Sequence, residues 1–197
     1  MIIGLIRHGI TDWNVLGKIQ GQTDIPLNVE GREQATALGN RLREESYTWD
    51  YVISSGLARA VETGSIIASI LSIPILEPDR RLLERSFGQV EGLTAEQREQ
   101  KWGLNWDQLE LGQEQNEVIQ ARGLAFLNDI WKKYPNKNIL VISHGAFLAQ
   151  LYQALYNDTY NERIGNLSLT ILEKEDIHWT PLLYNCNRHL QEIQHKS

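Results

Sequence analysis

The chain has 197 residues, which suits one ordinary domain and suffices to bury a core without a disulfide or metal staple. Hydrophobic residues make up 42% and charged residues 22%, so a disordered chain, a collagen and a coiled-coil rod are excluded. The 19 Lys and Arg residues against 25 Asp and Glu residues leave a formal charge of −6. Because this charge repels nucleic-acid backbones and anionic membranes, we expect neither as a partner.

The predicted elements alternate between short apolar runs and longer helical stripes. In chain order we expect a strand at 2–6, a helix at 30–45, a strand at 51–54, a helix at 57–71, a short strand at 74–77, a helix at 115–134, a strand at 138–143, a helix at 146–156, and late strands at 167–173 and 177–184. Strands that alternate with helices favour an α/β domain with a largely parallel sheet. We expect one domain over residues 1–197, with 93–112 as a lid-like segment of short helices.

The cellular location is predicted from cysteine usage and from the apolar runs. Cys186 is the single cysteine, so neither an internal disulfide nor a Cys-rich zinc site can form, and a reducing compartment is the simplest home. The first apolar run stops at Arg7 and is too short for a signal peptide. No stretch approaches the roughly 20 apolar residues that a membrane helix needs. We therefore expect a soluble cytoplasmic protein.

Polar side chains follow the strands that are predicted to lie in the middle of the sheet. Arg7 and His8 end the first strand, Arg59 lies one helical turn beyond the second, His144 ends the strand at 138–143, and Glu84 follows the short strand at 74–77. Binding sites in open α/β sheets lie at the carboxyl ends of the strands. Taken alone, each histidine would be interpreted as structural, Arg59 as a partner in a helix salt bridge and Glu84 as a surface acid. Because they occur together at the strand ends, they predict one shared cleft.

The other three histidines are interpreted as structural residues without a catalytic role. His178 begins a strand, and His189 and His195 lie in a polar tail. By contrast, a His-Gly pair ends each of two strands, and we expect the glycines Gly9 and Gly145 to let the backbone approach a ligand closely.

Two histidines and a carboxylate would suit zinc or iron as ligands. The permanent charges of Arg7 and Arg59 would, however, repel a divalent ion in the same cleft. Arginine instead grips phosphate oxygens with its planar fork of N–H groups. The better interpretation is a phosphoryl-transfer pocket without metal or other cofactor, in which the cations do the work that Mg²⁺ does elsewhere.

Five ordered blocks of sequence resemble the histidine phosphatase superfamily, which includes the cofactor-dependent phosphoglycerate mutases. The blocks are LIRHGITDWN at 5–14, QG at 20–21 followed by TDIPLN at 23–28, SSGLARAVET at 54–63, LERSFGQVEG at 83–92, and SHG at 143–145. The resemblance implies a three-layer α/β/α sandwich and a reaction through a phosphohistidine.

The same resemblance implies a role for each matching residue. His8 would be the nucleophile, and Glu84 would be the proton donor and acceptor. Arg7, Arg59 and His144 would hold the transferring phosphoryl group. Asn14, Gln20 and Gly145 would make further phosphate contacts. To attack phosphorus, His8 must be neutral, with its other ring nitrogen donating to an acceptor such as a backbone carbonyl.

The choice between phosphatase and mutase depends on the segment after the acid block. Similar mutases carry a Lys soon after the acid and an Arg pair, whereas Arg98 and Lys101 are the only basic residues between 93 and 120. Phe87 to Gly92 is more similar to the phosphatase branch, which includes broad-specificity and α-ribazole-phosphate phosphatases. Gln115 departs from the Gly-Glu-Ser of relatives, which predicts a weaker cap on the following helix.

We therefore expect a phosphatase that hydrolyses small phosphomonoesters, as a monomer or a homodimer. The alternatives are a cofactor-dependent phosphoglycerate mutase and, less favoured, a non-catalytic phosphate-binding module. The substrate itself is not predicted. We expect residues 93–112 to form the pocket walls, with Trp102 and Trp106 either lining an apolar pocket or packing a lid onto the core.

Overall fold

A computed structural model describes residues 1–176 and 178–194 of the chain. Its sheet has five strands in the order β2-β3-β1-β4-β5, with bounds β1 Ile2–Arg7, β2 Tyr51–Ser54, β3 Ile139–Ser143, β4 Leu169–Glu175 and β5 His178–Cys186. β1 and β2 each pair in parallel with β3, and β4 pairs antiparallel with both β1 and β5. The sheet is therefore mixed, although only β4 opposes the common direction. The carboxyl ends of β1, β2 and β3 meet at one edge.

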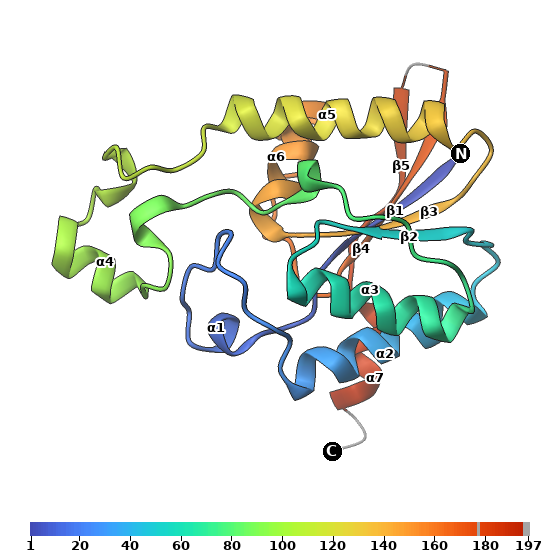
Figure 1. Cartoon of the computed structure of the whole chain (residues 1–197), viewed down its shortest axis with the longest axis horizontal. Helices are drawn as coiled ribbons and strands as arrows, with labels where there is room; N and C mark the ends of the chain where they lie inside the picture. Colours follow the sequence, from blue (N-terminus) through green and yellow to red (C-terminus); the bar gives the residue numbers. More distant parts are fainter. Residues whose placement is uncertain (177, 195–197) are drawn as a thin grey trace.

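Helices cover both faces of this sheet, which makes a three-layer α/β/α sandwich (Figure 1). One outer layer holds α2 (Val29–Glu44), α3 (Ala58–Leu71) and α7 (Arg188–Gln194), and the other holds α5 (Asn116–Lys133) and α6 (Gly145–Tyr156). Each layer packs its own core against the sheet. Leu38 and Ile67 belong to the first core, and Phe126 and Phe147 to the second. Burying each such side chain contributes about 1.5–3 kcal/mol.

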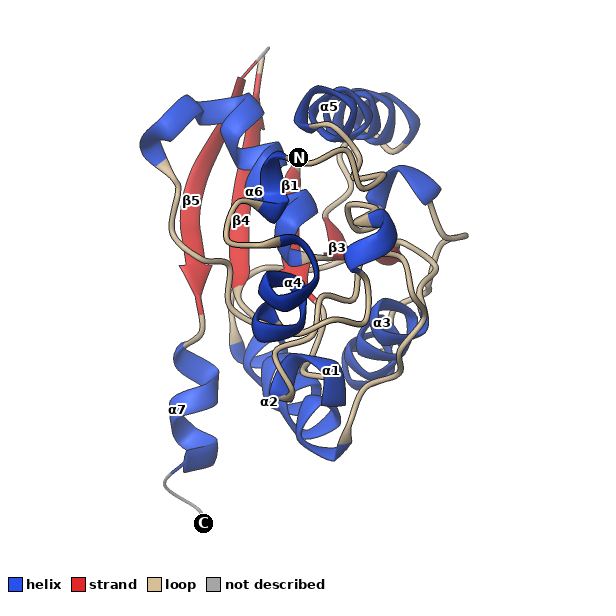
Figure 2. Ribbon diagram, turned by 90° about the vertical axis from the view of Figure 1, so that its left-hand side faces the viewer, coloured by secondary structure: helices blue, strands red, loops and turns tan. Residues whose placement is uncertain are grey.

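Two helices lie outside these layers, α1 (Asp12–Val15) and α4 (Ala95–Trp102). α4 and the following short 3-10 turn at Trp106–Gln108 project beyond the end of the sheet, as Figures 1 and 2 show from two directions. Short helices were expected in 93–112 and are present. The lid-like role of this segment stays a prediction, and so does the assignment of residues 1–197 to a single domain. No helix within the described ranges is long and apolar enough to cross a bilayer.

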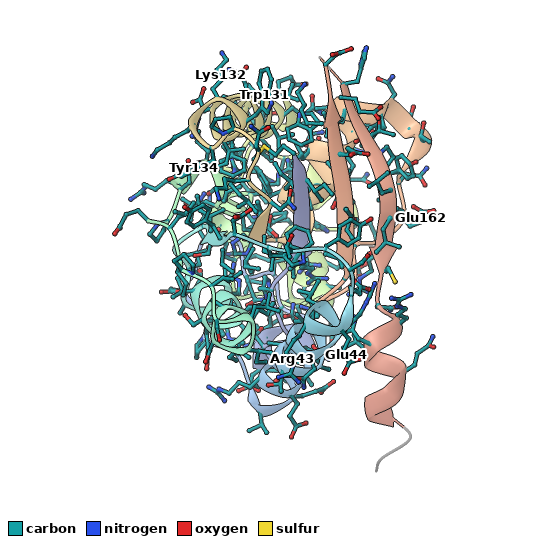
Figure 3. All side chains as sticks on the ribbon, turned by 90° about the vertical axis from the view of Figure 1, so that its right-hand side faces the viewer. Arg43, Glu44, Trp131, Lys132, Tyr134 and Glu162 are labelled. Carbon is teal, nitrogen blue, oxygen red and sulfur yellow. The ribbon has the colours of Figure 1, made fainter. Side chains whose placement is uncertain are left out.

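The described elements differ from the sequence expectations in two places. The predicted strand at 74–77 is reduced to one parallel bridge between Ile75 and Val52, because Pro74 and Pro78 leave too few N–H groups for a ladder. For the polar tail no element was predicted, but residues 188–194 form α7, which packs against α2 near the labelled Arg43 and Glu44 (Figure 3). The predicted start of the last strand, residue 177, and His195 lie outside the described residues.

His189 on α7 agrees with its interpretation as a structural histidine. Its side chain is buried, and its Nδ1 lies 3.2 Å from a guanidinium nitrogen of Arg41 on α2. The sequence did not predict α7, because the pattern of His189 and Leu190 after Cys186 is too short to indicate an amphipathic helix.

Candidate active site

Two histidines meet at the carboxyl edge of the sheet because β1 and β3 run in parallel and in register. Arg7 pairs with Ser143, so His8 and His144 follow the strands side by side. Their ring centroids lie 5.1 Å apart with the planes tilted by 56°. Both side chains are almost fully buried. Residues far apart in the chain thus form the centre of one polar cluster.

The protonation of His8 follows from its two neighbours. Nδ1 lies 2.7 Å from the carbonyl oxygen of Gly9, which can only accept, so Nδ1 carries the proton. Nε2 therefore presents a lone pair, toward which Nε of Arg59 donates at 3.3 Å. Burial, reinforced by the charges of Arg7 and Arg59, lowers the pKa of His8 well below its usual value. His8 is thus neutral at pH 7, and the predicted backbone acceptor is confirmed.

Arg59 reaches the cluster from the first turn of α3 and is completely buried. Its terminal nitrogens donate to the carbonyls of Thr23 at 2.9 Å and Gly21 at 2.7 Å. The loop that carries Gly21 and Thr23 is also bound to α3, because Asp24 accepts from the backbone N–H of Ala58 at 2.7 Å. Burial lowers the pKa of Arg59, and the guanidinium remains charged at neutral pH.

Arg7 lies at the end of β1 and is anchored by one hydrogen bond, from its NH1 group to the carbonyl of Ile164 at 2.7 Å. Its Nε is buried and has no partner among the described residues. Burial lowers the pKa of Arg7 to about 10, so the side chain is charged at pH 7. A buried cation with an unused donor is suited to binding an anion.

Glu84 meets the amino-terminal end of α6. Its Oε1 accepts the backbone N–H groups of Arg85 and Phe147, both at 2.8 Å, and Oε2 accepts from Ala146 at 3.1 Å. These bonds hold the carboxyl group at one position on the pocket wall. The first N–H groups of a helix lack partners within the helix, so Glu84 also caps α6, whose N-cap His144 makes no side-chain cap bond.

Asn14 and Gln20 are oriented by the turn around α1. Thr11 caps this helix, and its backbone N–H donates to Asn14 Oδ1 at 3.1 Å. The Thr11 hydroxyl lies 2.9 Å from Gln20 Oε1. Asn166, a residue that the sequence analysis missed, donates to Asn14 Oδ1 at 3.3 Å and to the carbonyl of His8 at 3.0 Å. With both amide oxygens engaged, the two NH₂ groups are left for the pocket that Asn14 and Gln20 line.

A cavity of about 420 Å³ is lined by Arg7, His8, Asn14, Gln20, Arg59 and Glu84. His144 is not among its lining residues, although the neighbouring Gly145 is. The outer wall contains Lys18, Phe87, Ala149 and the loop residues Asn161, Glu162, Arg163 and Ile164. Glu162 lies beside β5 (Figure 3). Residues 93–112 contribute nothing to this wall among the described residues, so that expectation is wrong. Instead, Trp102 lies under the ammonium of Lys101 at 4.4 Å and Trp106 under the guanidinium of Arg98 at 4.8 Å.

The two glycines that follow the histidines differ in role, and only one of them agrees with the expectation. A Cβ on Gly9 would lie 2.6 Å from the carbonyl oxygen of Gly31, so Gly9 permits close packing of β1 against α2. A Cβ on Gly145 would lie 3.2 Å from Nε of Arg7, and this glycine lines the cavity. Only Gly145 therefore stands where a ligand would approach the backbone.

The described residues contain no group of three or more His, Cys, Asp or Glu side chains that could hold a metal ion. The cavity instead contains the charges of Arg7, Lys18, Arg59 and Arg163 against those of Glu84 and Glu162. This local excess of positive charge lies in a chain whose formal net charge is −6. The arrangement suits a compact anion beside a neutral, nucleophilic imidazole.

Comparison with known proteins places the chain in a family. The profile of the histidine phosphatase superfamily (branch 1) matches residues 3–187, and the chain belongs to this superfamily. It is 36% identical over 190 residues to the uncharacterized phosphatase PhoE of Bacillus subtilis, with 94% of this chain and 95% of that protein covered. Proteins named 2,3-bisphosphoglycerate-dependent phosphoglycerate mutases match as well.

Solved structures agree with this family assignment. Bacillus stearothermophilus YhfR superposes with a TM-score of 0.86 at 28% identity, covering 96% of this chain and 98% of that one. A phosphoserine phosphatase mutant of Entamoeba histolytica in complex with phosphoserine gives 0.78 at 29% identity, with 96% and 98% covered. The fold expected from the sequence is confirmed.

Proposed function

We propose that this protein is a phosphatase that hydrolyses small phosphomonoesters through a phosphohistidine on His8. The observation that carries the proposal is the lone pair on His8 Nε2, which is created by the bond from Nδ1 to Gly9 and borders a cationic cavity. A neutral imidazole beside fixed guanidinium groups has the charge and geometry that attack on a phosphate dianion requires. Membership of the superfamily and similarity to named phosphatases support the same function.

The first half of the reaction transfers the phosphoryl group to the enzyme. The Nε2 lone pair of His8 forms a bond to phosphorus while the bond from phosphorus to the ester oxygen breaks. A protonated Glu84 gives its proton to the departing oxygen, since an alkoxide leaves poorly. Arg7, Arg59 and His144 stabilise the negative charge on the equatorial oxygens, and the amides of Asn14 and Gln20 with the backbone of Gly145 complete the cradle.

The second half restores the enzyme. Glu84, now ionised, takes a proton from water while the water oxygen bonds to phosphorus and the bond from phosphorus to His8 breaks. Phosphate leaves, and His8 is again neutral with a free Nε2 lone pair. Three backbone donors keep the Glu84 carboxyl in place through both steps. Since binding alone would need no positioned acid, the site favours an enzyme over a passive phosphate-binding module.

We propose that the reaction needs no metal, because Arg7 and Arg59 supply the charge that Mg²⁺ supplies in other phosphoryl transferases. Activity should survive exhaustive treatment with EDTA, and restoration by added Mg²⁺ or Zn²⁺ would contradict this part of the proposal. A cytoplasmic location also belongs to the proposal and is supported by the unpaired Cys186. Cell fractionation tests it.

The phosphoenzyme tests the main proposal. Brief incubation with a radiolabelled phosphomonoester should label the wild type in an acid-labile, alkali-stable form, as expected for phosphohistidine. His8→Ala should lose both the label and turnover. His178→Ala is the matched control, because His178 is exposed at the start of β5 and should keep both. A fully active His8→Ala variant would refute the proposal.

A phosphoglycerate mutase remains the second candidate because Lys18 and Arg163 line the outer cavity without an ion pair among the described residues. These cations favour a substrate with a second anionic group, such as a phosphorylated small acid. A panel of phosphorylated metabolites with and without a carboxylate, scored for phosphate release and for isomerisation, separates the candidates. Isomerisation stimulated by the bisphosphorylated acid would favour the mutase.

A further inference from the structure

Ser55, at the end of β2, contacts the second histidine of the site directly. Its hydroxyl oxygen lies 2.7 Å from Nε2 of His144, and both side chains are buried. β2 and β3 run in parallel and in register, so Ser54 pairs with Ile142 and the next residues of each strand emerge together. The contact therefore belongs to the framework of the sheet.

The direction of this hydrogen bond follows from the acceptors within reach of Ser55. Its oxygen accepts from the backbone N–H of Leu57 at 3.3 Å. Among the described residues, Nε2 of His144 is the only acceptor within hydrogen-bond distance of the Ser55 hydroxyl, so the hydroxyl hydrogen is directed toward His144. An imidazole that accepts at Nε2 while neutral carries its proton on Nδ1.

The Nδ1 atom of His144 is shielded from solvent and has no hydrogen-bond partner among the described residues. His144 is not among the cavity-lining residues, but its neighbours His8 and Gly145 are. Buried polar groups are nearly always paired, so an unpaired donor next to these residues indicates a missing acceptor. The ring of His8 lies only 5.1 Å away. Both imidazoles thus carry their proton on Nδ1. His8 offers the lone pair of its Nε2 atom, whereas His144 offers its Nδ1–H as a hydrogen-bond donor.

We propose that Ser55 is a positioning residue that holds His144 as the Nδ1–H tautomer, so that this imidazole donates to the phosphoryl group transferred through His8. The inference rests on the proposed phosphatase function and adds the origin of one donor in its cradle. Without Ser55, a neutral His144 is free to carry its proton on Nε2. Its Nδ1 lone pair would then face the negative oxygens and oppose binding.

The charges around His144 determine its protonation state. The groups that act on it are His8, Arg7 at the end of β1, Arg59 of α3 and Arg122 of α5, and Glu84 caps α6, of which His144 is the N-cap. Burial, with these positive neighbours, lowers the pKa of His144 well below its usual value. His144 is therefore neutral at pH 7 and needs the tautomer to act as a donor.

The test compares three variants at pH 7.5. Ser55→Ala should lower kcat/KM about 5- to 10-fold, as expected when one hydrogen-bond preference is lost. Ser55→Thr keeps the hydroxyl and should restore most of the activity. Ser143→Ala is the matched control, because this buried hydroxyl donates to the carbonyl of Leu82 instead of an imidazole. It should lower stability without changing the tautomer of His144.

A direct measurement of the tautomer separates this inference from the proposed function. Two-bond ¹H–¹⁵N correlation spectra of the wild type should show His144 protonated at Nδ1, and the spectra of Ser55→Ala should show protonation at Nε2 or a mixture. Protonation at Nε2 in the wild type, or an unchanged His144 tautomer in Ser55→Ala, would overturn the inference. Loss of the phosphohistidine signal with the expected tautomer present would refute the proposed function alone.

Discussion

Replacing Glu84 with Gln separates proton transfer from phosphate binding. The substitution keeps the shape of the side chain but removes the proton that assists the departing oxygen. General acid–base assistance is worth roughly 10²–10⁴ in rate, so kcat should fall by that factor, equivalent to about 3–5 kcal/mol of activation free energy. Removing a negative charge from beside Arg7 and Arg59 should leave inhibition by inorganic phosphate unchanged or stronger.

The structure also sets the cost of this substitution in stability. Oε1 of Glu84 accepts two backbone N–H groups and Oε2 accepts one. A glutamine therefore fits best with its oxygen at the Oε1 position and its NH₂ group facing Ala146. One hydrogen bond is lost in this orientation, which costs about 1–3 kcal/mol. Thermal unfolding should show a folded variant of modestly lower stability.

The assay compares leaving groups. p-Nitrophenolate departs without protonation, so the kcat/KM of Glu84→Gln, which reports the phosphorylation of His8, should fall much less with p-nitrophenyl phosphate than with an alkyl phosphate. Dephosphorylation still needs the base, so a burst of p-nitrophenolate should precede slow turnover. Glu91→Gln is the control, since Glu91 accepts from the Thr23 hydroxyl and the backbone of Gln22, and both substrates should respond equally. Equal losses for both substrates in Glu84→Gln, with no burst, would refute the assigned role.

Two further predictions concern stability. Burial and then Arg41 lower the pKa of His189 to about 4, whereas the unfolded histidine titrates near its ordinary value of about 6.5. The unfolded state therefore binds more protons between these values, and stability falls as the pH drops from about 6.5 to 4, by about 2 kcal/mol allowing for screening by solvent. Urea midpoints should show this slope in the wild type and a shallower one in His189→Asn; equal slopes would contradict it. Gly9→Ala brings a Cβ to 2.6 Å from the Gly31 carbonyl and should cost about 1–3 kcal/mol of stability, with reduced activity because the carbonyl of Gly9 holds the His8 proton. Gly165→Ala, whose Cβ would meet its nearest atom at 3.8 Å, should be nearly neutral by thermal unfolding.

The elements that the sequence predicted well are those with a repeating local pattern. The buried strand ending at Ser143 and the helix ending at Leu71 lie within a residue or two of their expected bounds, because apolar runs and helical stripes report burial directly. The missing side-chain cap at Gln115 was expected from its type and is found. The strand at 74–77 was wrong because the flanking prolines reduce its pairing with β2 to the single bridge at Ile75, which an apolar pattern does not reveal.

The amino-acid sequence by itself determined the class of the fold, the family and the residue types that come to the edge of the sheet, since these depend on local periodicity and on short ordered motifs. The tertiary structure decided how those residues face one another. The bond between Ser55 and His144, the amide of Asn166 under His8 and the outer wall at 161–164 join segments far apart in the chain. Such contacts depend on the register of β2, β3 and β1 and on where the loops return, and no local pattern encodes these.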